Sequence, residues 1–216
     1  MRPTRTIQAL ALPLLLSAGL ARAGVVINEI DYDQPGGFDT AEFIELKNTG
    51  PAPASLAGCY LELVNGHLGG AALYLTVPLP AVAVAPGGYF VVSFGSAYPW
   101  TTDLQFNLVD SSVQNGPPDA VALRDASGAM LDVVSYAGTS GAPYFEGVGT
   151  SVDDDNVTPN IGIARWPDGA DTDNNDADFS LRCITPGAPN VADAVACGLP
   201  VGAEDAAWGT VKGLFR

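Results

Sequence analysis

Basic side chains are scarce in this 216-residue chain, which contains 9 lysines and arginines, 24 acidic residues and a single histidine. Arg2, Arg5 and Arg22 lie near the N-terminus, so the chain after residue 23 has 6 basic residues against 24 acidic ones and a formal charge of −18. Such a polyanion repels nucleic acid and anionic membranes. The charge therefore excludes nucleic acid as an expected partner, and it favours either simple solubility or the binding of divalent cations.

The sequence also lacks the common catalytic motifs. It has no G-x-S-x-G elbow, phosphate-binding loop or H-E-x-x-H pair. Its one histidine, His67, follows an Asn65-Gly66 turn, where a lone histidine is typical of ordinary surface. A carboxylate-only metal hydrolase stays open, because two-metal chemistry can run on Asp and Glu. Outside the C-terminal tail, few basic residues could bind its anionic substrate: Lys47, Arg124, Arg165 and Arg182. We therefore predict a non-catalytic protein.

Long apolar runs are equally rare. The main one, Ile7–Leu20, follows Arg2 and Arg5 and precedes Ala21-Arg22-Ala23, an A-x-A cleavage pattern. This order predicts a secretory signal peptide over residues 1–23, and the run is too short for a membrane span. We therefore expect a secreted or cell-surface protein with no membrane span.

Cysteine occurs only three times, at Cys59, Cys183 and Cys197, with no spacing that suggests zinc. An oxidising compartment favours one disulfide and one remaining thiol. Cys183 and Cys197 flank the turn-rich ITPGAPN and are the favoured pair, with Cys59 buried as a small apolar residue. A bridge from Cys59 to either of the others is the alternative.

Short segments rich in β-branched and aromatic residues recur along the chain, which also contains 25 glycines and 17 prolines. This pattern favours an all-β sandwich or barrel over long helices. In EFIELKN, Ile44 and Leu46 face one side while Phe43 and Glu45 face the other, which predicts a half-exposed strand. The predicted strands are Val25–Tyr32, Glu42–Lys47, Tyr60–Val64, Leu73–Leu79, Tyr89–Phe94, Ala120–Arg124 and Met130–Tyr136.

The sequence changes character from about Ala137, where polar and glycine-rich loops replace the strand pattern. We interpret these loops as wrapping one domain that spans residues 24–190. Residues 191–216 are predicted to form a linker and a short tail, WGTVKGLFR. The tail is either a sorting or docking appendage or a terminal strand that packs Trp208 and Phe215.

Two acidic segments are candidates for binding Ca²⁺, which prefers six to eight hard oxygen ligands. In the first, carboxylates and an amide alternate along DTDNNDAD, at Asp171, Asp173, Asn175, Asp176 and Asp178. The segment is no EF-hand, because its sixth and twelfth positions are Asp176 and Arg182 rather than Gly and Glu. The alternative is a solvated loop capped by Asp and Asn turns.

The second candidate is the opening stretch, with Asp31, Asp33, Asp39 and Glu42. It could form its own site or converge with Asp171 and Asp173 at one end of the sandwich. The run Asp153-Asp154-Asp155-Asn156 is a weaker candidate.

The order of several motifs resembles the lamin tail domain. These are EFIELKNTG (Glu42–Gly50), SLAGCYLEL (Ser55–Leu63), AVAPGGYFVV (Ala83–Val92) and VALRDASGAMLDVVSY (Val121–Tyr136). The resemblance covers about Val25–Tyr136, and bacterial relatives also resemble Arg165–Phe179 and Thr185–Asn190. It implies an immunoglobulin-like β-sandwich with long loops, in which Leu56 fills the sandwich end and Gly58 permits a close approach.

These observations predict a secreted, bacterial, non-catalytic module for binding, adhesion or structure, steadied by Ca²⁺. Its partner would be an extracellular protein or carbohydrate. The resemblance suggests one alternative, an accessory domain that partners an extracellular nuclease or phosphatase. The remaining alternatives are a matrix protein attached through the tail and the metal hydrolase.

Overall fold

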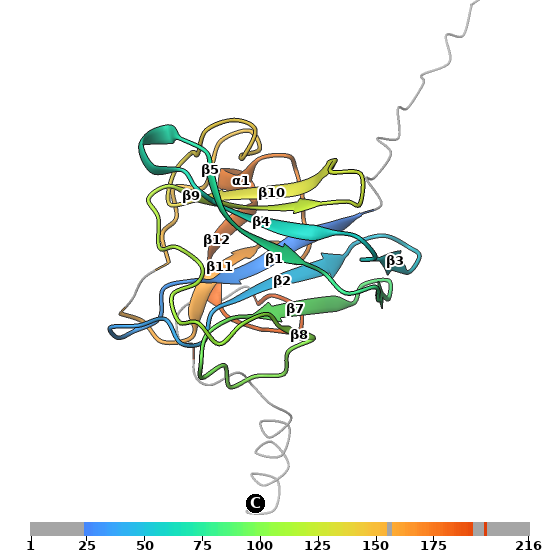
Figure 1. Cartoon of the computed structure of the whole chain (residues 1–216), viewed down its shortest axis with the longest axis horizontal. Helices are drawn as coiled ribbons and strands as arrows, with labels where there is room; N and C mark the ends of the chain where they lie inside the picture. The colour runs from blue at the N-terminus through green and yellow to red at the C-terminus, as the bar shows by residue number, and fades with distance from the viewer. Residues whose placement is uncertain (1–23, 155–156, 192–196, 198–216) are drawn as a thin grey trace, which may run out of the picture.

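The computed structural model describes residues 24–154, 157–191 and 197, and nearly all regular structure in this part of the chain is β-strand (Figure 1). The elements are β1 (Val25–Asp31), β2 (Phe43–Asn48), β3 (Ala54–Ser55), β4 (Tyr60–Asn65), the 3₁₀ turn η1 (His67–Gly69), β5 (Ala72–Pro78), β6 (Ala83–Val84), β7 (Tyr89–Ser93), β8 (Leu104–Gln105), β9 (Asp119–Arg124), β10 (Met130–Tyr136), β11 (Ile161–Arg165), α1 (Asn175–Asp178) and β12 (Phe179–Cys183). The predicted signal peptide and most of the predicted linker and tail lie outside the described residues.

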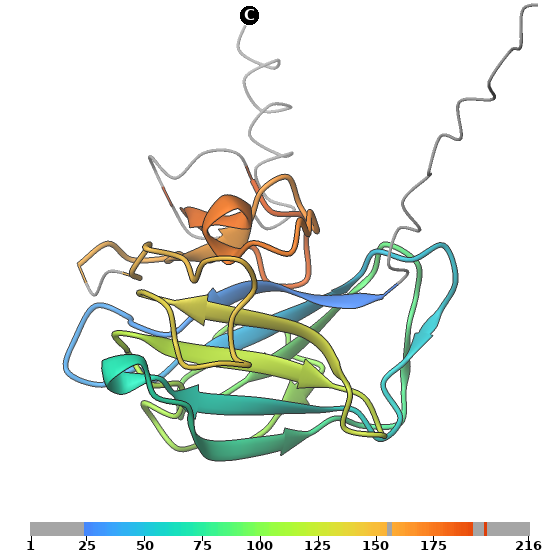
Figure 2. The same ribbon diagram turned by 90° about the horizontal axis from the view of Figure 1, so that it is seen from above.

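The strands form two sheets that face each other across one core (Figure 2). One sheet has the order β12-β11-β1-β2-β7-β8, and the other has the order β10-β9-β4-β5. Strands β3 and β6 pair separately, and all pairs are antiparallel except β7 with β8. This arrangement confirms the predicted immunoglobulin-like sandwich.

The core follows the alternation of the sequence. In β2, Ile44 and Leu46 are fully buried in the main core, as period-two patterning predicts. Leu56 is also fully buried. Gly58 has a φ of +76°, and an added Cβ there would lie 2.7 Å from the Cβ of Ala126. A side chain at Gly58 would thus meet both backbone strain and a steric clash.

The seven predicted strands are confirmed within one or two residues at each end. The segment after Ala137 was predicted to be loops, and this was wrong for β11 and β12. Strand β11 pairs with β1, with Glu29 opposite Ala164, and β12 pairs with β11. These five-residue strands lack a strong local signal, and their formation depends on the neighbouring strand rather than on propensity.

The outer face of the six-stranded sheet was predicted to be half-exposed and is in fact covered. Phe43 is buried against Val91, Ile184, Tyr98 and Trp100. Glu45, also fully buried, accepts hydrogen bonds from the Asn28 side chain at 2.9 Å and from the backbone N–H of Gly187 at 2.6 Å. Loop segments near residues 98–100 and 184–190 therefore form a partial third layer.

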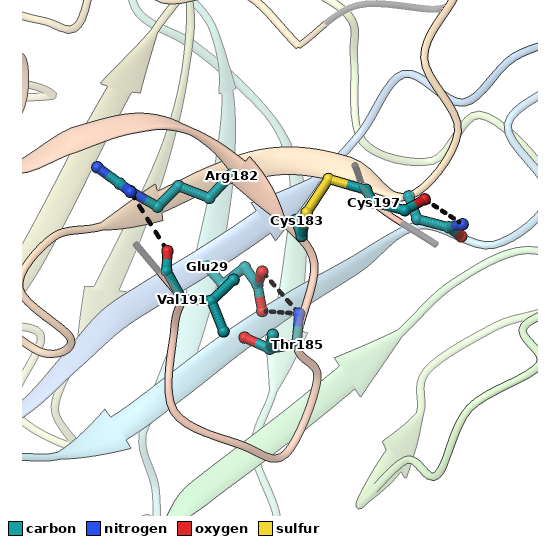
Figure 3. Close-up of a disulfide and its surroundings, with 7 residues drawn as sticks. Glu29, Arg182, Cys183, Thr185, Val191 and Cys197 are labelled. Atoms are coloured by element: carbon teal, nitrogen blue, oxygen red, sulfur yellow. Dashed lines mark hydrogen bonds between the residues drawn. A yellow bond between two sulfur atoms is a disulfide. The ribbon is translucent and has the colours of Figure 1, made fainter. Parts of the chain in front are cut away.

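The favoured disulfide is confirmed, because Cys183 and Cys197 are bonded and Cys59 is a buried free thiol. The loop that leaves Cys183 passes over Glu29, whose carboxylate accepts the N–H of Thr185 at 2.9 and 3.1 Å (Figure 3). Burial, followed by the charge of Glu45, raises the pKa of Glu29 well above its ordinary value.

The helical elements in the described part of the chain are short. The 3₁₀ turn η1 has three residues and α1 has four, so neither could span a bilayer.

Candidate metal centre

The site is built around a buried arginine. Arg165 is the last residue of β11 and is fully buried. Its guanidinium donates to both carboxylate oxygens of Asp132 on β10, at 3.0 and 3.1 Å, and to the carbonyl of Ile27 on β1 at 2.8 Å. Asp132 in turn accepts the N–H of Ile27 at 2.6 Å. The pair therefore links the two sheets through charged hydrogen bonds.

Two acids of the segment predicted to curl around Ca²⁺ bind this arginine as well. Asp178 accepts a hydrogen bond from Arg165 Nη1 at 2.9 Å, and Asp171 accepts one at 3.3 Å. Asp178 also accepts the N–H and the hydroxyl of Thr172. The segment from Asp171 to Asp178 thus wraps a guanidinium.

The other three predicted ligands have different roles. Asn175 is fully buried, and its amide accepts the N–H of Ser135 at 3.0 Å and donates to the carbonyl of Val133 at 2.8 Å. Asp176 is exposed and accepts the N–H and hydroxyl of Ser151. Asp173 lies on the surface with a φ of +55°. Asn175 therefore serves as a partner for the edge of β10, where its hydrogen-bonding groups are already used.

One group of three carboxylates among the described residues has the geometry to hold a metal ion: Asp132, Glu146 and Asp171. Ligand oxygens from the three residues all lie within 4.8 Å of one another. The Oε2 atom of Glu146 is buried without a hydrogen-bond partner, and so is the Oδ1 atom of Asn174. Burial, followed by the charges of Asp132 and Asp171, raises the pKa of Glu146 to about 8.

These residues fit a hard cation better than a soft one, because every candidate donor is oxygen. Asp171 was predicted from the sequence, whereas Asp132 and Glu146 were not. Asp132 occupies an ordinary strand segment and Glu146 a glycine-rich loop, so neither position belongs to an acidic run. An acid between apolar residues of a predicted strand, as in MLDVVSY, is the sequence signal that could have singled out Asp132.

The opening stretch forms a separate acidic region. Glu42 is fully buried and accepts the N–H groups of Ser112 and Val113 at 2.7 and 2.9 Å. Asp39 accepts the hydroxyl of Ser111 at 3.2 Å. These two acids therefore hold the loop before β9 against the opening stretch.

Asp31 and Asp33 lie next to Asp154, the weaker candidate. Asp154 accepts the N–H groups of Tyr32 and Asp33 at 3.1 and 3.3 Å, and its Oδ1 atom is buried without a partner. Burial, followed by the charge of Asp31, raises the pKa of Asp154 to about 9. Asp155 and Asn156 fall outside the described residues. The three-carboxylate group contains none of the acids of the opening stretch. The convergence of the opening stretch with Asp171 stays a prediction.

A family model described as the Lamin Tail Domain matches residues 20–138, more than half of the chain. The chain belongs to this family. A comparison with curated proteins found no match. Within this lamin tail domain protein, Asp132 lies inside the matched region, whereas Glu146, Arg165, Asp171 and Asp178 follow it. The candidate centre therefore joins the family's domain to its C-terminal extension.

The carboxylate of Asp31 is expected to destabilise the fold at high pH. Burial raises the pKa of Asp31 from 3.8 to about 7. The charges of Asp39 and Asp33 add to this rise, whereas a hydrogen bond from Gln34 opposes it. Because the folded-state pKa exceeds the unfolded value, ionisation of Asp31 costs stability progressively as the pH rises from about 4 to 7. We expect Asp31→Asn to raise the thermal midpoint by a few degrees at pH 8 and to leave it unchanged near pH 4.

Thermal melts in chelator at several pH values measure this effect. Asp125→Asn is the matched control, because hydrogen bonds from Ser127 and Ala129 lower the pKa of the exposed Asp125 and stabilise its charged form. This control should lower the midpoint slightly at pH 8. An Asp31→Asn midpoint at or below that of the wild type at pH 8 contradicts the prediction.

Proposed function

We propose that this lamin tail domain acts outside the cell as a non-catalytic binding or structural module whose C-terminal extension is fastened by Ca²⁺. The observation that carries the calcium proposal is the group of oxygens from Asp132, Glu146 and Asp171 within 4.8 Å of one another. The three residues come from β10, from the loop after it and from the loop after β11. A cation bound to all three would hold these segments together.

The charge balance of the centre supports a divalent ion. Asp132, Asp171 and Asp178 share the single positive charge of Arg165, and Glu146 adds a further carboxylate. With all four acids ionised, the cluster has three negative charges in excess. Asp132 and Asp178 are buried, Glu146 is partly buried and Asp171 is exposed. Buried charge without a counterion is costly, and Ca²⁺ with its oxygen preference would offset most of the excess charge.

Secretion is supported by the predicted signal peptide and by the disulfide between Cys183 and Cys197. Disulfides form and persist in oxidising, extracellular compartments. An extracellular protein or carbohydrate is the proposed partner class, in keeping with an immunoglobulin-like fold.

A hydrolase would use the same carboxylates differently, and the geometry favours the structural use. A metal hydrolase that acts on an anionic substrate commonly adds an Arg or Lys that binds the substrate beside the metal ions. Arg165, the arginine at this centre, is fully buried and engaged with three carboxylates. Its guanidinium holds the fold and is not available to a substrate.

Thermal melting with Ca²⁺ or with chelator tests the proposal. At a Ca²⁺ concentration 100 times the Kd, one site adds about 2.7 kcal/mol of stability. For a domain of this size, that raises the midpoint by about 5–10 °C. We expect this rise in the wild-type protein, whereas an unchanged midpoint at millimolar Ca²⁺ would refute the calcium site.

Two variants locate the ion. Glu146→Gln should abolish most of the calcium-dependent rise, because it removes a carboxylate of the three-residue group. Asp176→Asn is the control: it removes an acid of the linear DTDNNDAD segment whose carboxylate accepts from Ser151 instead. If Asp176→Asn loses the rise and Glu146→Gln keeps it, the ion binds the linear segment and the proposed centre is wrong.

A further inference from the structure

Strand β5 presents an open sheet edge. It is the last strand of the four-stranded sheet, where it pairs with β4 alone, and it runs along the margin of the ribbon in Figure 2. An edge strand directs every second pair of its backbone N–H and C=O groups away from the sheet. No backbone hydrogen bond described for this part of the chain uses the outer side of β5.

The opposite edge of the same sheet is closed. At β10, the Asn175 amide binds the N–H of Ser135 and the carbonyl of Val133, as a neighbouring strand would. The N–H of Thr150 donates to the carbonyl of Ser135 at 2.9 Å, and the N–H of Ala137 donates to Val152 at 3.1 Å. The fold thus satisfies one edge of this sheet with its own loops and leaves the other edge exposed.

Strand β5 also lies in the longest uncharged part of the chain. No Asp, Glu, Lys or Arg occurs between Glu62 and Asp103, in a chain with 24 acidic residues. Within this stretch Leu68 is 90% exposed and Leu73 is 49% exposed. Proteins commonly protect edge strands with charged residues, especially lysine, or with proline. Strand β5 has no charged residue, and its one proline, Pro78, is its last residue.

We propose that β5 pairs antiparallel with β5 of a second copy of this chain, so that two four-stranded sheets become one continuous sheet across a two-fold axis. Centred on Leu75, this pairing sets Tyr74 of one copy opposite Thr76 of the other. A second copy is the occupant that the charge distribution favours. Two strongly acidic molecules repel each other over most of their surfaces, and they approach at least cost where both are neutral. A two-fold axis lets the same uncharged edge serve both partners.

The pairing is independent of the calcium proposal, because β5 contains none of the carboxylates of the centre. Backbone hydrogen bonds provide the attraction, as in other cases of strand addition, and the exposed Leu73 adds apolar contact. Higher salt should strengthen the dimer, since it screens the repulsion between the two acidic bodies.

Sedimentation equilibrium from micromolar to millimolar protein, at low and physiological salt, tests this inference. We expect a reversible dimer in the wild type and at least a tenfold weaker dimer in Thr76→Lys and in Leu73→Lys. Each lysine reduces the net negative charge of the chain. A weaker dimer would therefore be caused by the change at the β5 edge and not by stronger repulsion between the two molecules. Thermal melts verify that both variants, changed at exposed positions, remain folded.

Leu108→Lys is the matched control, since Leu108 is 69% exposed and lies outside the uncharged stretch. It should dimerise at least as well as the wild type. A wild-type protein that is monomeric at millimolar concentration would overturn the inference. So would a folded Thr76→Lys variant that dimerises like the wild type.

Discussion

Replacing Arg165 by methionine is expected to lower the free energy of unfolding by about 3–5 kcal/mol, the usual cost of removing one partner of a buried ion pair. Methionine retains much of the side-chain volume but leaves Asp132 and Asp178 buried without their counterion. It also removes the donor to the carbonyl of Ile27. Urea denaturation of the wild type and the variant in chelator measures the loss.

The control is Arg182→Met, which removes an arginine that stacks on Trp166 at a partly exposed position. Charged interactions at such positions contribute up to about 1 kcal/mol, so this variant should remain close to the wild type. Ca²⁺ should bind Arg165→Met more tightly than the wild type and should restore part of its stability, because the variant centre is more negative. Equal losses in the two variants would show that Arg165 does not organise the core.

Replacing Cys183 and Cys197 by serine is expected to cost about 3 kcal/mol, the chain-entropy value for a closed loop of about 15 residues. The two cysteines are 14 positions apart in the sequence. Their bond closes the segment that contains Thr185, whose N–H donates to Glu29, and we expect it to hold this segment in place. Loss of the bond should therefore let water reach the outer face of the six-stranded sheet.

Urea denaturation, together with hydrogen exchange at Thr185 and Gly187, measures both effects. The matched control is Cys59→Ala, which changes the buried free thiol without altering the disulfide. It should leave exchange at both amides unchanged. A double serine variant with wild-type stability and wild-type exchange would show that the disulfide only follows a loop that is already fixed.

The sequence predicted the strands whose pattern is local. In β2, the alternation of Ile44 and Leu46 identifies the core face regardless of context. Strand β11 was missed because Ile161–Arg165 includes a glycine and ends in an arginine, which usually indicates a turn or a surface. The burial of Arg165 is explained by its ion pair with Asp132, which the local sequence does not predict.

The candidate centre shows the same limit. Asp171 was predicted because it belongs to a visible run of acids, whereas Asp132 and Glu146 reach it only through the packing of β10 and the following loop. A linear pattern also suggested Asn175 and Asp176, whose side chains have local partners instead. Spacing along the chain identifies ligands that share a loop, and it says little about ligands that separate elements bring together.

The C-terminal extension makes β1 an interior strand of its sheet instead of an edge strand. Residues 20–138 match the lamin tail domain, yet β1 lies between β2 and β11, and β11 follows the match. Without the extension, the first strand of the domain would itself be an open edge, with Glu29 and Asp31 deprived of part of their cover. The family match therefore ends before β11 and β12, two strands of the sheet that contains β1, and we expect a transfer of this module between proteins to need both parts.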